Sequence, residues 1–228
     1  MKSTAADVRR RVLRSENRFW HVDDFGGEPH AVAMALGRLL ETGELERLRR
    51  GVYWRGGDTH FGRQRPEAVR TLREVAGDRE AVGAAGWYAT NLLGLSTQVA
   101  PRPVVSITGR PPTGLRGIEV INRAARTGRR DAHLNETEVT VLEALEGWDK
   151  YVEVDSKKAL DRFAQLLDAE EVRIDRLVRA AKTESPVVRE RLRAILVRVG
   201  AEEAASTIPR ARSEASRKRA LRVIATDG

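Results

Sequence analysis

The stretch LERLRRGVYWRGG, residues 45–57, alternates apolar and charged residues on both sides of a single glycine. This alternation is typical of two short strands that pair as a hairpin, and Gly51 permits the positive φ that a tight turn requires. The apolar residues predicted to point to one side of the ribbon are Leu45, Leu48, Val52 and Trp54. The arginines predicted to surround the rest are Arg47, Arg49, Arg50 and Arg55.

A helix is predicted directly before this hairpin, in EPHAVAMALGRLLETG, residues 28–43. Pro29 suits the first helical turn, and Gly43 suits the position just past the helix end. An inward stripe recurs at helical spacing and contains Val32, Leu36, Leu39 and Leu40. The face predicted to point outward contains His30, Met34, Arg38 and Glu41.

Two further elements are predicted upstream. STAADVRRRVLRS, residues 3–15, reads as an amphipathic helix, and FWHVDDFGG, residues 19–27, reads as a short element whose Trp20, Val22 and Phe25 fill a small core. The resulting order is helix, short helix, helix and two-stranded ribbon, which is the order of a winged helix-turn-helix. We therefore predict a DNA-binding domain over residues 1–60.

In a helix-turn-helix the second helix enters the major groove, whereas wing arginines contact phosphates or the minor groove. The residues that we expect to contact double-stranded operator DNA are His30, Met34, Arg38, Arg47, Arg49, Arg50 and Arg55. An alternative remains open, because arginines on an edge strand also protect a sheet against aggregation.

Composition limits the function classes. The 228 residues carry a formal net charge of +8, which favours a polyanionic partner such as nucleic acid. The chain has no cysteine, which excludes disulfides, thiolate zinc sites and cysteine nucleophiles. No stretch is long and apolar enough to span a bilayer, and we expect a cytoplasmic protein without membrane association.

The remainder is predicted to be a mixed α/β domain over residues 66–200, followed by a basic, flexible tail over 201–228, in which SEASRKRALRVI is an alternative candidate for a partial helix. The strands are expected at 103–108 and 117–122, and the main helices at 135–146, 156–168, 171–181 and 186–199. The expected N-caps are Asn135, Ser156 and Ser185. The fold class is therefore α+β and rich in helices.

Several blocks resemble the AbiEi-type antitoxins of type IV toxin–antitoxin systems: ALGRLLETGELERLRRGVYWRGG, GWYATNLLGLSTQVAPRPVVSITGRPP, ETEVTVLEALEGWDKY and AAKTESPVVRERLRAILVRVG. They cover about residues 4–200. The resemblance implies an autoregulatory repressor that binds inverted repeats through its winged helix. It also implies a C-terminal domain that counters a cognate nucleotidyltransferase-like toxin. It assigns no catalytic residue and no cofactor, and it leaves the oligomeric state open.

Two other functions remain as alternatives. One is a transcription factor whose C-terminal domain senses a ligand. The other is a Mg²⁺-dependent nuclease, because Asp155 and Lys157 in VEVDSKK match the acid-x-Lys half of a restriction-type site. Such a site needs a second acid, for which Asp131 and Asp149 are the candidates. The four histidines show no metal-ligand spacing, so no metal site is expected.

Overall fold

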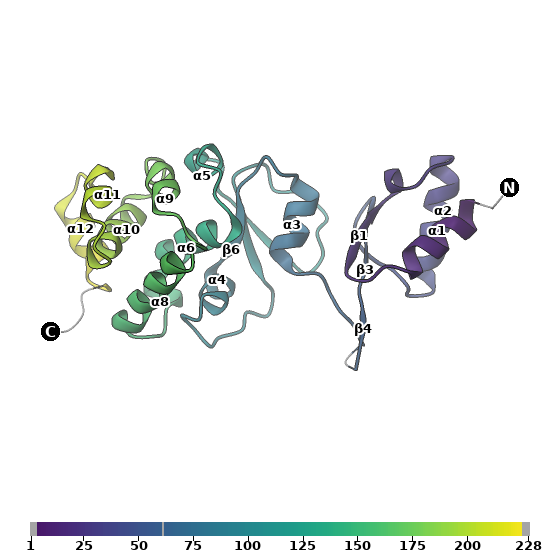
Figure 1. Ribbon diagram of the computed structural model, residues 1–228, viewed down its shortest axis with the longest axis horizontal. Coiled ribbons are helices and arrows are strands. Elements are labelled where there is room, and N and C mark those ends of the chain that lie inside the picture. Colours follow the sequence, from purple (N-terminus) through teal and green to yellow (C-terminus); the bar gives the residue numbers. More distant parts are fainter. Residues whose placement is uncertain (1–3, 61, 225–228) are drawn as a thin grey trace. The chain divides into compact units, whose positions relative to one another are not determined.

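The computed structural model describes residues 4–60 and 62–224 and has a mixed α+β fold, rich in helices, with small sheets (Figure 1). The chain forms two compact units. Unit 1 runs to Val75 and includes Pro112–Arg116, and unit 2 comprises Ala76–Pro111 and the chain from Gly117 onward. None of the helices in the described ranges is long and apolar enough to traverse a lipid bilayer.

Unit 1 begins with a helix and contains two small sheets. Its elements are α1 (Thr4–Leu13), β1 (Arg18–His21), the 3-10 helix η1 (Val22–Asp24), α2 (Pro29–Glu41), β2 (Glu46–Arg49), β3 (Val52–Arg55), β4 (Asp58–Thr59), β5 (Gly62–Arg63) and α3 (Ala68–Ala76). The larger sheet has the order β1-β3-β2, and both of its pairs are antiparallel. The second sheet is the β4–β5 hairpin.

The larger sheet is covered on both faces. One face packs on α1 and α2, and the cluster there includes Val12, Trp20, Leu36, Leu45 and Tyr53. The other face carries Phe19, Leu48, Val52 and Trp54, against which Val75 of α3 packs. The prediction that Leu45 lies on the same side as Leu48 is therefore wrong. Leu45 and Leu48 are three residues apart, and this odd separation places them on opposite faces of an extended chain.

Unit 1 is longer than the predicted residues 1–60. Asp58–Thr59 and Gly62–Arg63 form the β4–β5 hairpin, and Trp54 Nε1 donates a hydrogen bond to the backbone oxygen of Gln64 at 2.7 Å. Farther along, the guanidinium of Arg70 on α3 lies 5.3 Å from the ring centre of Phe19. These contacts attach residues beyond 60 to the sheet, so the first compact unit ends near residue 75.

Unit 2 combines one small sheet with many helices. Its elements are β6 (Val82–Ala85), α4 (Gly86–Leu92), β7 (Val104–Ile107), β8 (Glu119–Asn122), α5 (Thr127–Asp131), α6 (Glu136–Glu146), α7 (Trp148–Tyr151), α8 (Ser156–Asp168), α9 (Ile174–Ala181), α10 (Pro186–Arg198), α11 (Glu202–Thr207) and α12 (Glu214–Leu221). The sheet order is β6-β7-β8, with β6 antiparallel and β8 parallel to β7.

The local signals in unit 2 locate most of these elements. The predicted strands at 103–108 and 117–122 correspond to β7 and β8, and Asn135 and Ser185 cap α6 and α10 as expected. The prediction of Ser156 as the N-cap of α8 is wrong. Asp155 is the cap, because its carboxylate accepts a hydrogen bond from the Lys158 backbone N–H, while Ser156 Oγ donates to Val223 O.

The strand β6 was not expected from the sequence. Its residues VGAA lack the β-branched and aromatic run that marks a strand. A side-chain carbon at Gly83 would lie 2.6 Å from Val139, so glycine is what allows α6 to approach the sheet closely. The hydroxyl of Thr140 on α6 then accepts a hydrogen bond from the Ala84 N–H at 3.0 Å, which satisfies a donor on this edge strand.

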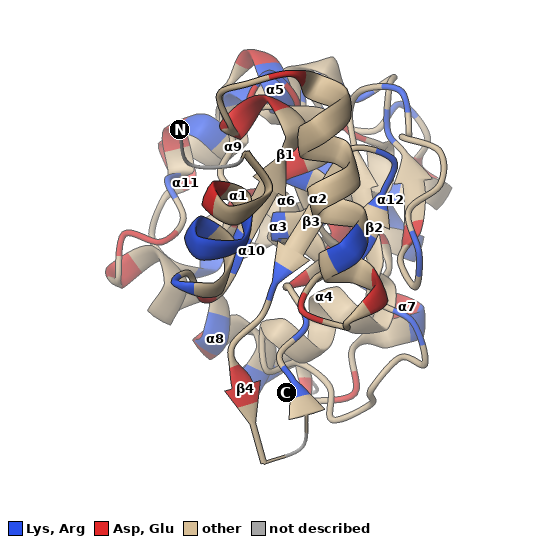
Figure 2. Ribbon diagram, turned by 90° about the vertical axis from the view of Figure 1, so that its right-hand side faces the viewer, with Lys and Arg blue, Asp and Glu red and all other residues tan. Residues whose placement is uncertain are grey.

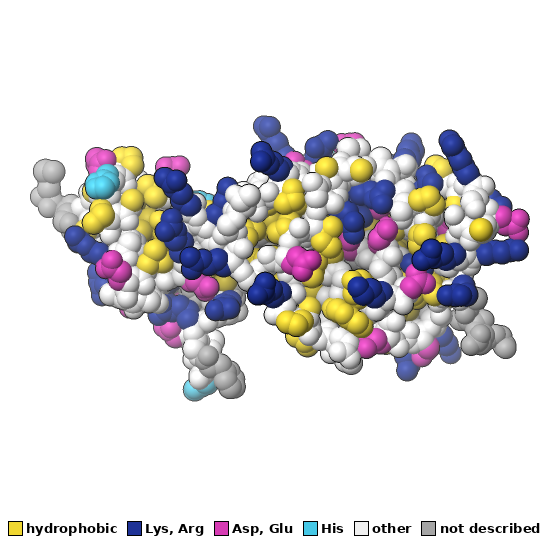
Figure 3. Space-filling model, turned by 180° about the vertical axis from the view of Figure 1, so that it is seen from behind, with side chains coloured by type: hydrophobic (Ala, Val, Ile, Leu, Met, Phe, Trp, Pro, Cys, Tyr) yellow, Lys and Arg dark blue, Asp and Glu magenta, His cyan; other side chains and the backbone are white. Residues whose placement is uncertain are grey.

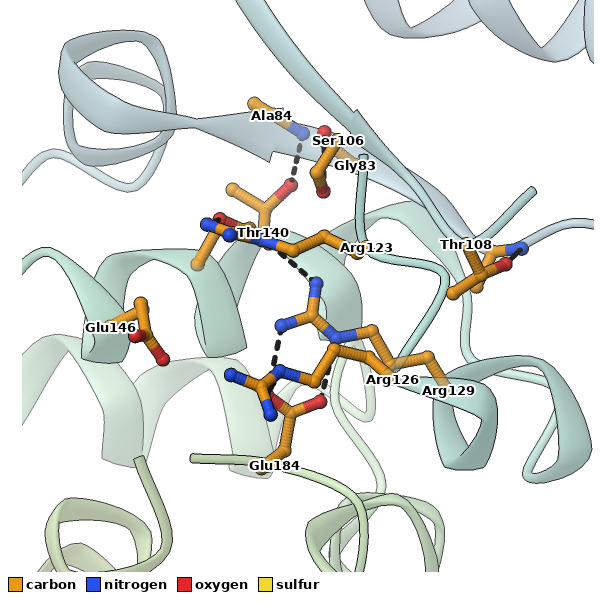
Figure 4. A network of polar contacts seen from close by, with 12 residues as sticks. Gly83, Ala84, Ser106, Thr108, Arg123, Arg126, Arg129, Thr140, Glu146 and Glu184 are labelled. Carbon is orange, nitrogen blue, oxygen red and sulfur yellow. Dashed lines mark hydrogen bonds and ion pairs between the residues drawn. The ribbon is translucent and has the colours of Figure 1, made fainter. Parts of the chain in front are cut away.

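A buried ion network joins α5, α6 and the start of α10 (Figure 4). Arg129 is 1% exposed and contacts Glu143 at 2.6 Å and Glu184 at 2.7 Å. Arg123 makes a bidentate pair with Glu143, both distances being 2.8 Å. Burial by itself would raise the pKa of Glu143, but the hydrogen bond from Arg123 and the charge of Arg129 outweigh it, so this pKa is lowered.

The C-terminal segment is folded where the sequence analysis expects a flexible tail. α11 and α12 both pack on α10, and Ala205, Ile208, Ala211 and Ala220 are buried. Arg191 of α10, which is fully buried, donates to the backbone oxygens of Ala220 and Leu145 and to the carboxylate of Asp149. The tail is held because its backbone groups find partners on α10, which its basic composition does not reveal.

Candidate nucleic-acid interface

The outward face of α2 matches the sequence prediction. His30, Met34 and Arg38 are separated by one helical turn each and are all exposed, with Met34 at 51%. The opposite face is buried against α1 and η1 through Val32, Leu36 and Leu39. The exposed stripe therefore has two polar side chains on either side of the Met34 thioether.

The N-terminal end of α2 is acidic. The carboxylate of Glu28 caps the helix by accepting a hydrogen bond from the Ala31 N–H at 2.7 Å. Backbone hydrogen bonds from His30 and Ala31 lower the pKa of Glu28, so it is ionised at neutral pH. A negative charge here disfavours a phosphate at the helix N-terminus, which leaves Arg38 as the one cation among residues 28–41.

The β2–β3 turn presents the arginine cluster. The turn consists of Arg50 and Gly51, whose φ is +82°, and Arg47 and Arg50 are exposed while Arg49 is half-buried. The Leu45 N–H donates to Leu39 O at 3.0 Å, which attaches the hairpin to the last turn of α2. The local geometry therefore follows from the glycine in the turn and from the short connection after α2.

These arginines are uncommitted within the described residues. No hydrogen bond or ion pair there engages the side chains of Arg38, Arg47, Arg49 or Arg50. Figure 2, which faces unit 1, shows that basic residues lie on several of its elements and that α2 itself is mostly neutral. Among these four free cations, three lie on the hairpin and one lies on α2.

Arg55 does not belong to this surface, and its assignment to the DNA-contacting set is corrected here. Its side chain is 8% exposed, its Nη1 donates to Gly56 O at 2.8 Å, and its Nη2 lies 3.8 Å from Glu44 and 3.7 Å from Asp58. All four residues of β3 are buried because the sheet is covered on both faces. The alternation that suggested an outward Arg55 assumes one open face.

Sequence reasoning missed a second group of basic residues near α1. The guanidinium of Arg18 lies 4.1 Å from the centre of the Trp20 ring, and that of Arg11 lies 4.8 Å from the centre of Phe25. Cation–π contacts of this kind fix a side chain against the protein. These arginines therefore stabilise unit 1 and add positive charge to it, and only the position of the two rings identifies them.

The structure also places the residues of the alternative nuclease site. Asp155 is an exposed helix cap and precedes α8 rather than lying on a strand, and Lys157 is exposed in the first turn. Asp149 pairs with Arg191, and Asp131 lies beside Arg130 at the end of α5. Within the described ranges, no three His, Cys, Asp or Glu residues are grouped so that they could hold a metal ion.

Comparisons with known proteins find a match to a protein family and a match to a solved structure. The model of a family described as "Family of unknown function (DUF6088)" matches residues 13–185. The crystal structure of the RV2827C protein from Mycobacterium tuberculosis aligns with a TM-score of 0.48 at 16% identity, covering 91% of this chain and 80% of that chain. No curated protein matches the sequence.

Proposed function

Since this chain belongs to the DUF6088 family, whose function is unknown, we propose its function from the geometry of unit 1 and from the resemblance of its sequence blocks: it is an antitoxin and autoregulatory repressor. Unit 1 is a winged helix-turn-helix that binds double-stranded operator DNA, with α2 as the recognition helix and the β2–β3 hairpin as the wing. Unit 2 counters a cognate toxin protein. The operator is a set of inverted repeats, and the protein acts in the cytoplasm.

The observation that carries the DNA-binding proposal is the arrangement around α2. The order α1, β1, η1, α2, β2, β3 with an antiparallel β1-β3-β2 sheet is the arrangement expected of a winged helix. The exposed stripe of His30, Met34 and Arg38 then faces base edges, and the uncommitted arginines of the turn contact phosphates. Arg38 is the candidate for a bidentate contact with guanine.

The edge-strand explanation makes a different prediction from the same residues. β2 lies at the edge of its sheet, and arginines there also discourage pairing with another chain. Under that explanation their removal promotes association and leaves DNA affinity unchanged. One DNA-binding experiment with variants of these arginines therefore distinguishes the two explanations.

We expect Arg49→Ala combined with Arg50→Ala to weaken binding to every duplex. The full chain is first used to select its operator from a pool of random duplexes, and affinity for the selected and for unrelated duplexes is then measured across salt concentrations. Each lost phosphate contact changes the log–log salt slope by roughly 0.9, so the double variant is expected to flatten it by about 1.8. The cause is the release of fewer counterions.

A matched control is Arg102→Ala combined with Arg110→Ala, which removes the same charge from exposed positions of unit 2. This control is expected to keep the wild-type slope. Equal salt slopes for the wild type and the wing variant would mean that Arg49 and Arg50 do not contact the DNA. The edge-strand explanation would then account for these arginines.

The antitoxin role rests on the resemblance of blocks that lie mainly in unit 2, and its test is genetic. The proposal expects a nucleotidyltransferase-like reading frame beside this gene, and that frame is expressed alone and then together with wild-type or variant chains. We expect the wild type and the Arg49→Ala, Arg50→Ala variant to restore growth equally, because the wing is not part of unit 2. Loss of rescue by a correctly folded wing variant would contradict this division between the units.

A further inference from the structure

Unit 2 has a large open groove between α10 and α12, with a volume of about 1280 Å³. Each helix contributes a stripe at i, i+3, i+4 and i+7 spacing. The stripe of α10 is Glu190, Arg193, Ala194 and Val197. The stripe of α12 is Glu214, Arg217, Lys218 and Leu221. Two helical faces side by side form the kind of trough in which a third helix packs.

The floor of the groove is apolar and unpartnered. Val197 is 50% exposed and Leu221 is 37% exposed, and together they are two of the five large hydrophobic residues that are exposed among the described residues. Exposed large hydrophobic side chains gathered in one concave site are a mark of an interaction surface.

The walls of the groove are rigid. Arg193 donates to the backbone oxygens of Ala205 and Ile208, and Glu190 accepts from the Ala211 N–H. Arg217 donates to Ala211 O at 3.2 Å. These side chains bind the connecting segment to both helices, so the groove is preformed and its charged residues are not all available to a partner.

The rim is positively charged. Arg210, Arg219 and Arg222 line the groove, are exposed, and have no side-chain partner among the described residues. Glu214 is paired with Lys218 at 3.1 Å in a highly exposed ion pair. Figure 3 shows one face of the molecule, and on unit 2 in this view basic side chains lie among hydrophobic ones. The free charge around the groove is therefore cationic.

We propose that this groove binds an acidic amphipathic helix of a partner protein. The helix places an apolar stripe on Val197 and Leu221 and its Asp or Glu side chains against Arg210, Arg219 and Arg222. A stripe from i to i+7 is about 10 Å long, which accommodates two turns of the bound helix. The apolar floor favours a peptide over nucleic acid, whose contacts with a basic surface are made through phosphates.

A second copy of this chain does not supply such a helix from its described residues. The other exposed large hydrophobic residues are Met34, Leu92 and Val99. Met34 lies on α2, which spans one arginine and one glutamate, Leu92 lies on the uncharged α4, and Val99 lies in a loop. The inference concerns unit 2 and holds whether or not unit 1 binds DNA.

The test uses the full chain to select from a displayed library of randomised helical peptides of about 16 residues, long enough to form helix on binding. Enriched peptides are expected to carry Asp or Glu on both sides of an apolar i, i+3, i+7 stripe. Val197→Glu is expected to weaken their binding at least roughly tenfold, because it places a carboxylate in the centre of the site. Val99→Glu is the control, because Val99 is an exposed valine of unit 2 that does not line the groove.

A second variant, Arg219→Glu with Arg222→Glu, changes only exposed rim residues and is expected to weaken the same peptides without loss of thermal stability. Enrichment of basic or neutral peptides, no enrichment above the background, or equal binding by the Val197→Glu chain would each overturn the proposal. The proposal would also be overturned if the rim variant bound DNA more weakly than the wild type but bound the selected peptides equally well. The rim would then be a nucleic-acid contact.

Discussion

Arg129→Ala is expected to destabilise unit 2 by about 3–5 kcal/mol, the typical cost of removing one partner from a buried ion pair. The guanidinium is 1% exposed, and its loss leaves Glu184 without its closest cation and Glu143 with Arg123 alone. Both carboxylates are buried, so water cannot replace the missing charge without opening the core. We expect the urea transition of unit 2 to move to much lower denaturant concentration, with unit 1 unaffected.

The adjacent arginine provides the control. Arg130 is 45% exposed and lies 3.6 Å from Asp131, which is 63% exposed, so Arg130→Ala removes the same charge and chain length at little cost. A shift in Arg129→Ala no larger than that in Arg130→Ala would mean that the network contributes little to stability. Arg129→Ala is also expected to lose the ability to rescue cells from the toxin, because unit 2 unfolds.

Arg191→Ala is expected to release α12 from α10. The fully buried guanidinium satisfies the backbone oxygens of Ala220 and Leu145 and pairs with Asp149, so its removal leaves two carbonyls without their donor. An unsatisfied buried polar group costs about 1–3 kcal/mol, and we expect a total on the order of 3 kcal/mol. Hydrogen exchange of the amides in 214–221 measures the release directly.

The control for Arg191 lies on the same helix. Arg198 ends α10 and is exposed, so Arg198→Ala is expected to leave the protection of α12 unchanged. The groove depends on α12, and Arg191→Ala is therefore also expected to abolish binding of the selected acidic peptides. Full protection of 214–221 in Arg191→Ala would show that apolar packing alone holds this helix.

The candidate interface was largely predictable because its signals are local. The 3.6-residue period of α2 identifies His30, Met34 and Arg38 as outward, and Gly51 locates the turn that carries Arg49 and Arg50. Arg55 was assigned wrongly because the sheet face that it shares with Tyr53 is covered by α1 and α2, and because its guanidinium lies beside Glu44 and Asp58. The alternation within the hairpin does not show that this face is covered.

The amino-acid sequence by itself determined the short-range features: the start of α2 at Pro29, the caps Asn135 and Ser185, and the positive charge of the hairpin. Tertiary structure decided the strand β6, the burial of Arg55 and the folding of residues 202–221. Hydrogen-bonded caps and turns involve residues three or four apart, so a short stretch of sequence is enough to determine them. β6 has a weak local preference for a strand, and Thr140 bonds to its backbone. The residues of α12 favour a helix, but the packing of this helix on α10 depends on Arg191, which only the folded chain brings to it.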